Sequence, residues 1–310
     1  MNRTLEIKPT KYGRKELSEN KNESEKITPH ERKDYPTEGK SQTGNETPTE
    51  NTSVNKTEKD VLLEIKEVRY TYCTKTAETE ALRRVSFSVE KGGFVAVVGP
   101  SGCGKTTLLS LISGTISPTV GKVILSGNCR VGYMLQRDHL FEWRTVEKNL
   151  LLGPETEKNL TDETRNYVSG LIDKYGLGEF RKVKPRQLSG GMRQRAALIR
   201  TLATKPDLLL LDEPFSALDF QTRMKVCDDV YSIIKNEGKT ALLVTHDVSE
   251  AISMADRIVV LSKRPATVRK ILSPNFDRNL SPLMRRESPS FAPTFQELWT
   301  DISSDSPQND

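Results

Sequence analysis

The most constraining feature of the chain is an apolar run, Phe94–Val98, that leads directly into the glycine-rich segment Gly99–Thr107. A short, continuous apolar run of this kind is typical of a strand that is buried on both faces of a sheet. The residues that follow, TTLLSLISG, predict a helix that ends at Gly114. A buried strand, a tight loop and a helix in succession form the unit from which parallel, helix-covered sheets are built.

Further segments repeat this alternation between strands and helices. Apolar or alternating segments predict strands at residues 61–72, 85–89, 121–127, 130–135, 207–211, 240–245 and 257–261. Amphipathic segments predict helices at residues 146–152, 161–175, 190–202 and 224–235. The strands are interrupted by a long helical stretch, so we expect an α/β domain with a largely parallel sheet and an inserted helical subdomain.

The two ends of the chain differ in composition from the middle. Residues 1–60 are rich in Lys, Glu, Thr, Ser and Asn, and they cannot bury enough apolar surface to offset the entropy of ordering. We expect them to form a disordered, solvated arm. An ordered domain is predicted at 61–265, with its helical subdomain at about 137–203. Residues 266–310 are predicted to be a partly disordered extension, in which VRKIL adds a strand and FQELWTDI a short helix.

Composition excludes several classes of protein. No stretch of 18 apolar residues is present, which argues against a membrane span, and the first residues lack the apolar core of a secretion signal. Cys73, Cys103, Cys129 and Cys227 lack metal-ligand spacing, so we expect reduced, cytosolic thiols. The net charge of +5 permits contact with an anionic membrane surface. Because no basic stripe with interleaved aromatic residues is present, we expect no nucleic-acid partner.

The glycine-rich segment fits the pattern G-x-x-x-x-G-K-[ST] of a phosphate-binding loop. Its glycines let the backbone curl so that N–H groups point at phosphate oxygens, and the helix that follows adds its positive end. Lys105 supplies a charge to the β- and γ-phosphates, and the Thr106 hydroxyl is placed to bind Mg²⁺. The predicted nucleotide-binding residues are Gly99, Pro100, Ser101, Gly102, Cys103, Gly104, Lys105, Thr106 and Thr107.

Two adjacent carboxylates, Asp212 and Glu213, stand at the end of the apolar segment DLLLL. The first is placed to hold Mg²⁺, usually through water, and the second to orient the water that attacks a γ-phosphate. We therefore predict that Asp212 binds the metal and that Glu213 is the general base. In isolation such a pair would more often be a charge pair at a helix N-terminus. The phosphate loop upstream favours the catalytic interpretation.

A second glycine-rich element, LSGGMRQR, occupies Leu188–Arg195. Ser189 offers a hydroxyl group, Gly190 and Gly191 leave backbone N–H groups open, and a helix begins there, which together predict a second anion site. The alternative is an ordinary helix N-cap. If both elements bind phosphate, one chain carries two such surfaces on different subdomains. Head-to-tail pairing of two chains would then enclose two ATP molecules.

In this order, the motifs GPSGCGKTT, LSGGMRQR and DLLLLDEP resemble those of the ATP-binding-cassette (ABC) ATPases, and the resemblance extends over about Val61–Leu261. It implies the P-loop NTPase fold of that family, with a mostly parallel sheet, an antiparallel β subdomain and an inserted α-helical subdomain. It also implies an enzyme that hydrolyses ATP with Mg²⁺. The enzyme is expected to work as a homodimer or paired with a similar ATPase.

The resemblance assigns further roles at the catalytic site. His246, which follows TALLVT, resembles the switch histidine that contacts the γ-phosphate. Gln136 resembles the glutamine that reaches Mg²⁺ and the attacking water. Together with Lys105 and Glu213, these residues form the expected catalytic set. An aromatic ring that stacks on adenine is expected at Tyr72, with Tyr70 as the alternative; either ring could instead pack within its strand.

The resemblance also assigns residues to the dimer interface. The loop Ser216–Asp219 resembles the one that crosses between the two subunits. The residues expected to act on the ATP of the partner subunit are Ser189, Gly190, Gly191 and Asp219.

A finer resemblance connects the chain to the ATPase subunits of nitrate, sulfonate and taurine importers. It rests on VGYMLQRDHLFEWRTVEKNLLLG and on the C-terminal Phe…Leu-Trp segment. It implies a peripheral subunit on the cytoplasmic face of the membrane, with an integral membrane permease and an extracytoplasmic solute-binding protein as partners. Phe141, Trp143 and Arg144 are candidates to line the groove that receives the permease; alternatively, Trp143 packs inside the helical subdomain. An exporter subunit is the alternative function, and a soluble ATPase acting on nucleic acid or ribosomes is a more distant one.

Overall fold

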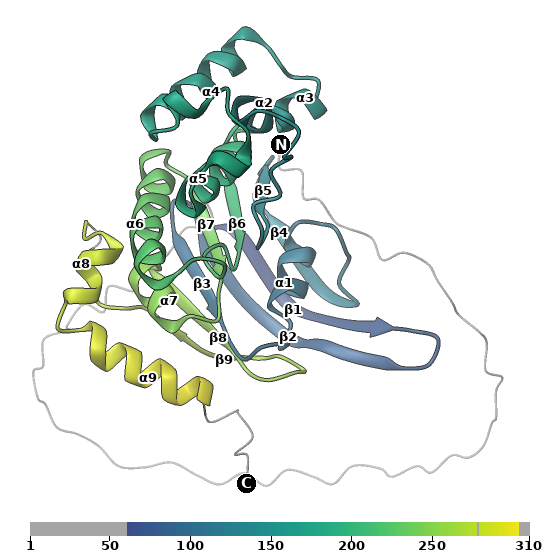
Figure 1. The fold of residues 1–310 in the computed structure, drawn as a ribbon. Coiled ribbons are helices and arrows are strands. Elements are labelled where there is room, and N and C mark those ends of the chain that lie inside the picture. The colour runs from purple at the N-terminus through teal and green to yellow at the C-terminus, as the bar shows by residue number, and fades with distance from the viewer. Residues whose placement is uncertain (1–60, 278, 304–310) are drawn as a thin grey trace, which may run out of the picture. The chain divides into compact units, whose positions relative to one another are not determined.

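The computed structural model describes residues 61–277 and 279–303 of the chain. The expected N-terminal arm lies outside these residues. The larger of two sheets has six strands in the order β5-β6-β7-β3-β8-β9 (Figure 1). Its strands are β3 (Phe94–Val98), β5 (Val131–Met134), β6 (Leu208–Asp212), β7 (Thr240–Val244), β8 (Arg257–Leu261) and β9 (Val268–Leu272). The first five in the spatial order pair in parallel, and β9 pairs antiparallel with β8.

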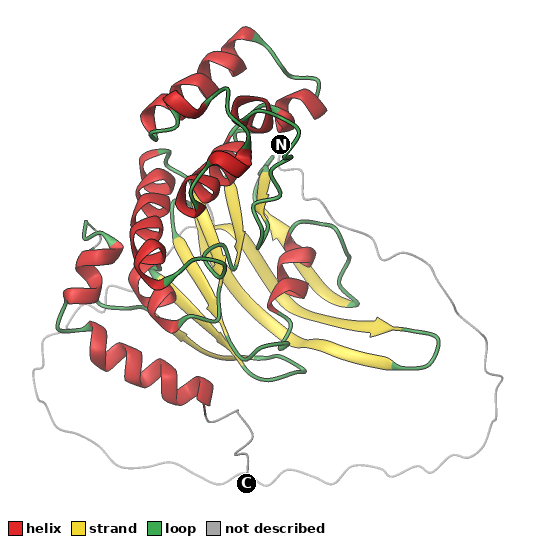
Figure 2. Ribbon diagram, in the orientation of Figure 1, coloured by secondary structure: helices red, strands yellow, loops and turns green. Residues whose placement is uncertain are grey.

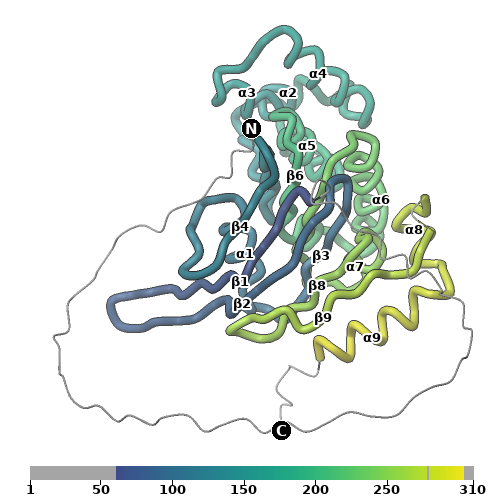
Figure 3. The backbone as a smooth tube through the Cα atoms, turned by 180° about the vertical axis from the view of Figure 1, so that it is seen from behind, coloured from purple at the N-terminus to yellow at the C-terminus, as the bar shows by residue number. Residues whose placement is uncertain are grey.

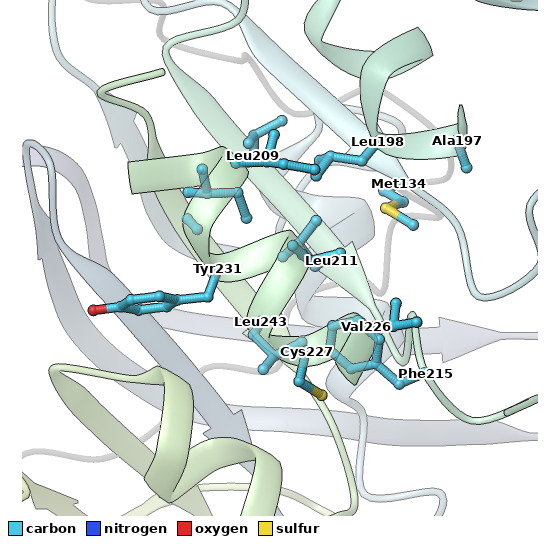
Figure 4. Packing of buried hydrophobic residues seen from close by; sticks show 14 of the residues in the cluster. Met134, Ala197, Leu198, Leu209, Leu211, Phe215, Val226, Cys227, Tyr231 and Leu243 are labelled. Carbon is cyan, nitrogen blue, oxygen red and sulfur yellow. The ribbon is translucent and has the colours of Figure 1, made fainter. Parts of the chain in front are cut away.

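The larger sheet separates two apolar clusters, because successive side chains of a strand point to opposite faces. In β3, Phe94, Ala96 and Val98 belong to one cluster, whereas Val95 and Val97 belong to the other. The first cluster includes side chains of α5 (Gly190–Leu202), α6 (Phe220–Asn236), α7 (Val248–Met254) and α9 (Phe291–Ser303). Figure 4 shows part of it around Leu211 and Phe215. The second cluster lies under α1 (Lys105–Ile112) and the smaller sheet. The sheet is therefore covered on both faces, as its continuous apolar strands require (Figure 2).

The smaller sheet is antiparallel and has the order β2-β1-β4. Its strands are β1 (Val61–Cys73), β2 (Glu78–Glu90) and β4 (Val120–Leu125), which lie together in Figure 3. The strand predicted at 85–89 begins earlier, at Glu78, because β1 supplies backbone partners along its full length. The polar residues in this stretch gave no apolar signal, since they pair through their backbone and stay largely exposed.

The helical block contains α2 (Val146–Leu150), α3 (Leu152–Thr156), α4 (Asp162–Lys174) and α5 (Gly190–Leu202), and the first three pack against α5. The single helix predicted at 146–152 is wrong, since the chain forms two short helices there. Pro154 has no N–H group to donate to the carbonyl of Leu150 and its ring clashes with that turn, so a continuous helix is excluded.

The last described elements, β9, α8 and α9, pack against the sheet domain. Strand β9 belongs to the larger sheet, so this sheet continues past residue 265, where the domain was expected to end. Helix α8 (Pro282–Glu287) contacts α6 (Phe220–Asn236) and α7 (Val248–Met254), and α9 (Phe291–Ser303) contacts α7 and β8. Leu298 of α9 is fully buried in the first cluster. The segment FQELWTDI, predicted to be a short helix, lies within α9.

Arg285 attaches α8 to α6 and α7, and its side chain is only 2% exposed. Its guanidinium donates to the Tyr231 hydroxyl at 2.8 Å and to the Ser253 carbonyl at 3.3 Å, and it lies 5.1 Å from the centre of the Tyr231 ring. The Asp256 carboxylate lies 3.9 Å away. These partners offset part of the cost of burying the cation, while its Nε has no hydrogen-bond partner among the described residues.

This arrangement predicts the effect of two neighbouring substitutions. Arg285→Ala should lower the free energy of unfolding by about 2–3 kcal/mol, since it removes hydrogen bonds from a charged donor and a cation–π contact. Arg286→Ala, at a partly exposed position of the same helix, should change it by about 0.5 kcal/mol or less. Urea unfolding of the two variants measures the difference. Equal effects would contradict the assigned role of Arg285.

Candidate active site

The carboxyl ends of β3, β6 and β7 lie at the same edge of the larger sheet, because these strands are parallel neighbours. Val244 of β7 pairs with Val97 on one side and with Asp212 on the other, so the three ends are level. The phosphate loop follows β3, the acidic pair ends β6, and His246 follows β7. Three motifs that are far apart in the sequence therefore meet at one place.

The loop Gly99–Gly104 curls around the amine of Lys105. The Lys105 Nζ donates to the carbonyls of Gly99 at 2.8 Å and of Pro100 at 3.1 Å, and the side chain is almost fully buried. Gly104 has φ +119°, a conformation that L side chains rarely adopt, so the motif needs glycine there. Cys103 is buried, and burial raises the pKa of its thiol. The loop thus holds a positive charge at the start of α1, which suits a phosphate group.

Asp212 is the buried carboxylate of the site, with 6% exposure. Burial raises its pKa, and the hydrogen bond from Tyr133 opposes this rise; Glu213 raises the pKa and Thr106 lowers it. The Tyr133 hydroxyl donates to Asp212 Oδ2 at 3.1 Å. We did not predict Tyr133 from the sequence. Tyr133 lies on β5, the strand next to β6, and the sequence alone does not show that these two strands are neighbours.

Two predicted residues, His246 and Gln136, converge on the Glu213 carboxylate. Its Oε2 lies 3.1 Å from His246 Nδ1 and accepts a hydrogen bond from Gln136 Nε2 at 3.3 Å. Glu213 has φ +43°, which is costly for a residue with a side chain. Two contacts hold this backbone: its N–H donates to Val244 at 2.8 Å, and its carbonyl accepts from Ser216 Oγ at 3.0 Å. Backbone strain held in this way is characteristic of functional positions.

The two candidate tyrosines occupy different environments on β1. The Tyr72 hydroxyl lies 2.9 Å from Thr107 Oγ1, next to the phosphate loop, and the residue is 42% exposed. Tyr70 packs against the second apolar cluster and meets the Tyr72 ring edge-on, with the ring centres 4.8 Å apart. Tyr72 therefore offers the free aromatic surface beside the loop, and Tyr70 supports it.

The comparisons with known proteins agree with this geometry. A sequence profile described as "ABC transporter" matches residues 82–216. The uncharacterized ABC transporter ATP-binding protein YtlC of Bacillus subtilis is 46% identical over 249 residues, which cover 78% of this chain and 96% of that protein. The chain belongs to the family of ABC transporter ATP-binding proteins. It is accordingly an ATPase that binds ATP, which confirms the expected enzyme class.

Other members of the ABC family agree with this assignment. The taurine import ATP-binding protein TauB of Ruegeria pomeroyi is 40% identical and covers 63% of this chain and 75% of its own length. The aliphatic sulfonates import ATP-binding protein SsuB of Bacillus thuringiensis is 36% identical, with 77% and 93% covered. The solved ATP-binding cassette MJ0796, a dimer bound to ADP and Pi, matches with a TM-score of 0.59 and 29% identity over 70% of this chain and 100% of that one. The expected ABC fold class is thus confirmed.

The element LSGGMRQR at Leu188–Arg195 contains the start of α5. The Ser189 hydroxyl accepts a hydrogen bond from the N–H of Met192 at 3.4 Å and thereby caps the helix. Asp219 caps α6 in the same manner, accepting from Thr222 at 3.0 Å, and this hydrogen bond holds its pKa below the usual value. In the described part of the chain, no hydrogen bond joins either residue to the phosphate loop. The structure therefore leaves them apart from the cluster around Glu213.

Close packing gives the two glycines of this motif a second role. A Cβ atom on Gly191 would lie 2.8 Å from Val226 Cγ2 of α6, and one on Gly190 would lie 2.9 Å from Leu218 Cδ2. The sequence suggested only that these glycines leave backbone N–H groups open. The structure shows that Gly191 also lets α5 approach α6 closely, and that Gly190 lets α5 approach Leu218 in the loop before α6.

The aromatic pair after Gln136 lies on the surface. Trp143 is 72% exposed and stacks on Phe141, with the ring centres 4.5 Å apart. The alternative in which Trp143 packs inside the helical block is wrong. Arg144 is engaged differently from the two rings, since it donates to Glu155 at 2.6 Å. Among the described residues, the helices are too short or too polar to span a lipid bilayer.

The packing of Gly191 predicts opposite results at two helical glycines. Gly191→Ala should destabilise the protein by about 1–2 kcal/mol, because the clash with the stiff, buried Val226 exceeds the gain in helix propensity. Gly170→Ala in α4, where a Cβ would meet nothing within 4 Å, should instead stabilise it by about 0.5–1 kcal/mol. Thermal unfolding of both variants measures this. Stabilisation by Gly191→Ala would show that the helices do not pack this closely.

Proposed function

We propose that this chain is the ATP-hydrolysing subunit of an importer of small anionic or zwitterionic solutes of the nitrate, sulfonate and taurine type. The observation that carries the catalytic part is the convergence of His246 and Gln136 on the Glu213 carboxylate, beside the loop that holds Lys105. The import part rests on the printed names of the TauB and SsuB relatives. Those names favour import over the alternative of an exporter subunit.

Each side chain has a distinct role in this proposal. Glu213 accepts a proton from the water that attacks the γ-phosphate, and Gln136 orients that water. His246 contacts the γ-phosphate and is kept beside Glu213 at 3.1 Å. Lys105 exchanges its loop carbonyls for β- and γ-phosphate oxygens, where its charge offsets the charge of the transition state. Tyr72 presents the exposed ring on which adenine stacks.

The donor atoms at this site fit Mg²⁺. Magnesium is bound by one or two carboxylates together with the phosphates of the substrate, rather than by an all-protein cage. The Asp212 carboxylate and the Thr106 hydroxyl supply such a partial set, and the Thr106 hydroxyl lowers the pKa of Asp212. Gln136 is the third proposed ligand. When bound, the ion would neutralise phosphate charge, and Tyr133 would keep the Asp212 carboxylate in orientation.

The working unit in this proposal is a dimer. MJ0796, which this chain resembles, is described as dimeric. Ser189, Gly190 and Gly191 stand at the start of α5, where N–H groups and a hydroxyl suit an anion. Together with Asp219 at the start of α6, they would act on the ATP of the partner subunit. ATP binding closes the dimer and hydrolysis opens it. The helical subdomain at about 137–203 moves together with the LSGGMRQR element that it carries, and it transmits the opening and closing of the dimer.

The membrane partners follow from the same proposal. The protein would lie on the cytoplasmic face of the membrane, bound to a separate permease that also works with an extracytoplasmic solute-binding protein. Trp143 and Phe141 form the exposed aromatic surface next to the Gln136 segment, and exposed aromatic anchors of this kind are common at protein interfaces. Residues 61–265 would form the ATPase domain, and β9 adds a further strand to its sheet.

Replacement of the proposed base tests the catalytic assignment. Glu213→Gln should reduce kcat about 100-fold or more, because the amide cannot accept the proton of the attacking water. ATP binding should persist, so an ATP-bound dimer should accumulate in size-exclusion chromatography. Lys105→Ala serves as a contrasting variant, which should weaken ATP binding itself. Hydrolysis by Glu213→Gln at the parent rate would remove Glu213 from the mechanism.

The two tryptophans of the chain offer a matched test of the permease surface. Trp143→Ala should weaken the complex with the membrane permease about 30-fold or more, as expected of an aromatic hot spot. Trp299→Ala, at a 56% exposed position on α9, should leave the affinity unchanged. Both variants should keep the ATPase rate of the isolated subunit. Equal permease affinity in the two variants would place the docking surface elsewhere.

A further inference from the structure

Arg223 lies on the first turn of α6, and its guanidinium joins two loops of the active site. One N–H donates to the carbonyl of Leu218 at 2.9 Å, within the loop proposed to cross the dimer interface. Another donates to Asp247 Oδ2 at 3.2 Å, directly after His246. The planar, forked guanidinium suits this bridge, since it can hold two acceptors in fixed directions. No sequence motif singled out this residue.

Hydrogen bonds hold Asp247, the residue after His246, both to α7 and to Thr245, the residue before His246. Asp247 caps α7 through its Oδ1, which accepts from the N–H groups of Ser249 and Glu250. Its own N–H donates to Thr245 Oγ1 at 3.0 Å. His246 therefore lies between two residues that are hydrogen-bonded to each other. A displacement of Asp247 must carry the His246 backbone with it.

Glu250 contacts both Thr245 and Arg223 and holds them in place. Its side chain is 3% exposed, accepts from Thr245 Oγ1 at 2.6 Å, and has Oε1 at 3.8 Å from Arg223 Nε. Burial raises the pKa of Glu250 to about 7, and Arg223 and the Thr245 hydroxyl oppose this rise. The buried Glu250 carboxylate and the Arg223 guanidinium therefore stabilise each other, and this restricts where the Arg223 side chain can lie.

The contacts form a closed ring around the proposed base. Glu213 contacts His246, and its carbonyl accepts from Ser216 at the start of the interface loop. The loop ends at Asp219, and its Leu218 carbonyl is held by Arg223, which returns through Asp247 to His246. Each step is a direct contact, so the interface loop and the switch histidine are mechanically connected within one subunit.

We propose that Arg223 is a positioning residue for ATP hydrolysis, which sets the place of His246 according to the position of the Leu218 loop. Contact of this loop with a second copy of the chain then adjusts the histidine in the same subunit. The inference rests on the proposed function, because it takes His246 and Glu213 as the catalytic pair. In the proposed function, Arg223 itself contacts neither ATP nor the partner subunit.

The test compares Arg223→Met with Lys225→Met in the full chain. Both remove one positive charge from the same helix, but Lys225 is exposed. Arg223→Met should lower kcat about tenfold to a hundredfold, as a small misplacement of a catalytic group does, with ATP affinity unchanged. Lys225→Met should keep kcat. A purely structural Arg223 would instead lower the unfolding temperature and leave the kcat of the folded protein intact, which would overturn the inference.

A double-mutant cycle with Asp247→Asn locates the connection. Asparagine preserves the cap of α7 while it removes the charge that faces Arg223. If the two residues act through one bridge, the double variant should be no slower than the slower single variant. Multiplied effects would overturn the shared path. The activity of Glu213→Gln keeps the two hypotheses apart: if it retains turnover, the proposed function fails, whereas inactive Glu213→Gln with fully active Arg223→Met refutes only the inference.

Discussion

The parallel pairing of β6, β7 and β3 is the constraint on which the rest of the site depends. It brings the ends of three strands to one edge of the sheet, so a lysine, two carboxylates and a histidine from distant parts of the chain become neighbours. The pairing in turn depends on strands that are apolar on both sides, which need cover on both faces. Two layers of helices and a small antiparallel sheet supply that cover.

Around this edge, the chain accepts local costs to hold polar groups in place. Asp212 and Glu250 are buried carboxylates, and each is kept by a hydroxyl donor, from Tyr133 and Thr245 respectively. Glu213 has a backbone conformation that side chains disfavour, held by hydrogen bonds of its main chain to Val244 and Ser216. Groups fixed in this way need little rearrangement when a charged ligand arrives, and this preorganisation is how active sites stabilise transition states.

Packing and function act on the same residues at the start of α5. Gly191 fits against Val226 with no space for a side chain, and Ser189 caps the helix that carries the motif. The end of the chain is bound just as firmly, since Arg285 is buried between α8, α6 and α7 and Leu298 lies in the core. The C-terminal segment therefore stabilises α7, the helix that begins next to His246.

The sequence by itself determined the family, the phosphate loop, the acidic pair, and most core strands and long helices, because these depend on local patterns of apolar residues and on motifs of fixed spacing. It also placed Gln136 and His246 by resemblance. Only the tertiary structure decided that Trp143 is exposed, that Tyr72 rather than Tyr70 faces the phosphate loop, that Tyr133 donates to Asp212, and that Arg223 donates to Asp247 beside His246. The physical reason is that such contacts join residues far apart in the chain, and their partners are fixed by strand order and helix packing, which no local pattern encodes.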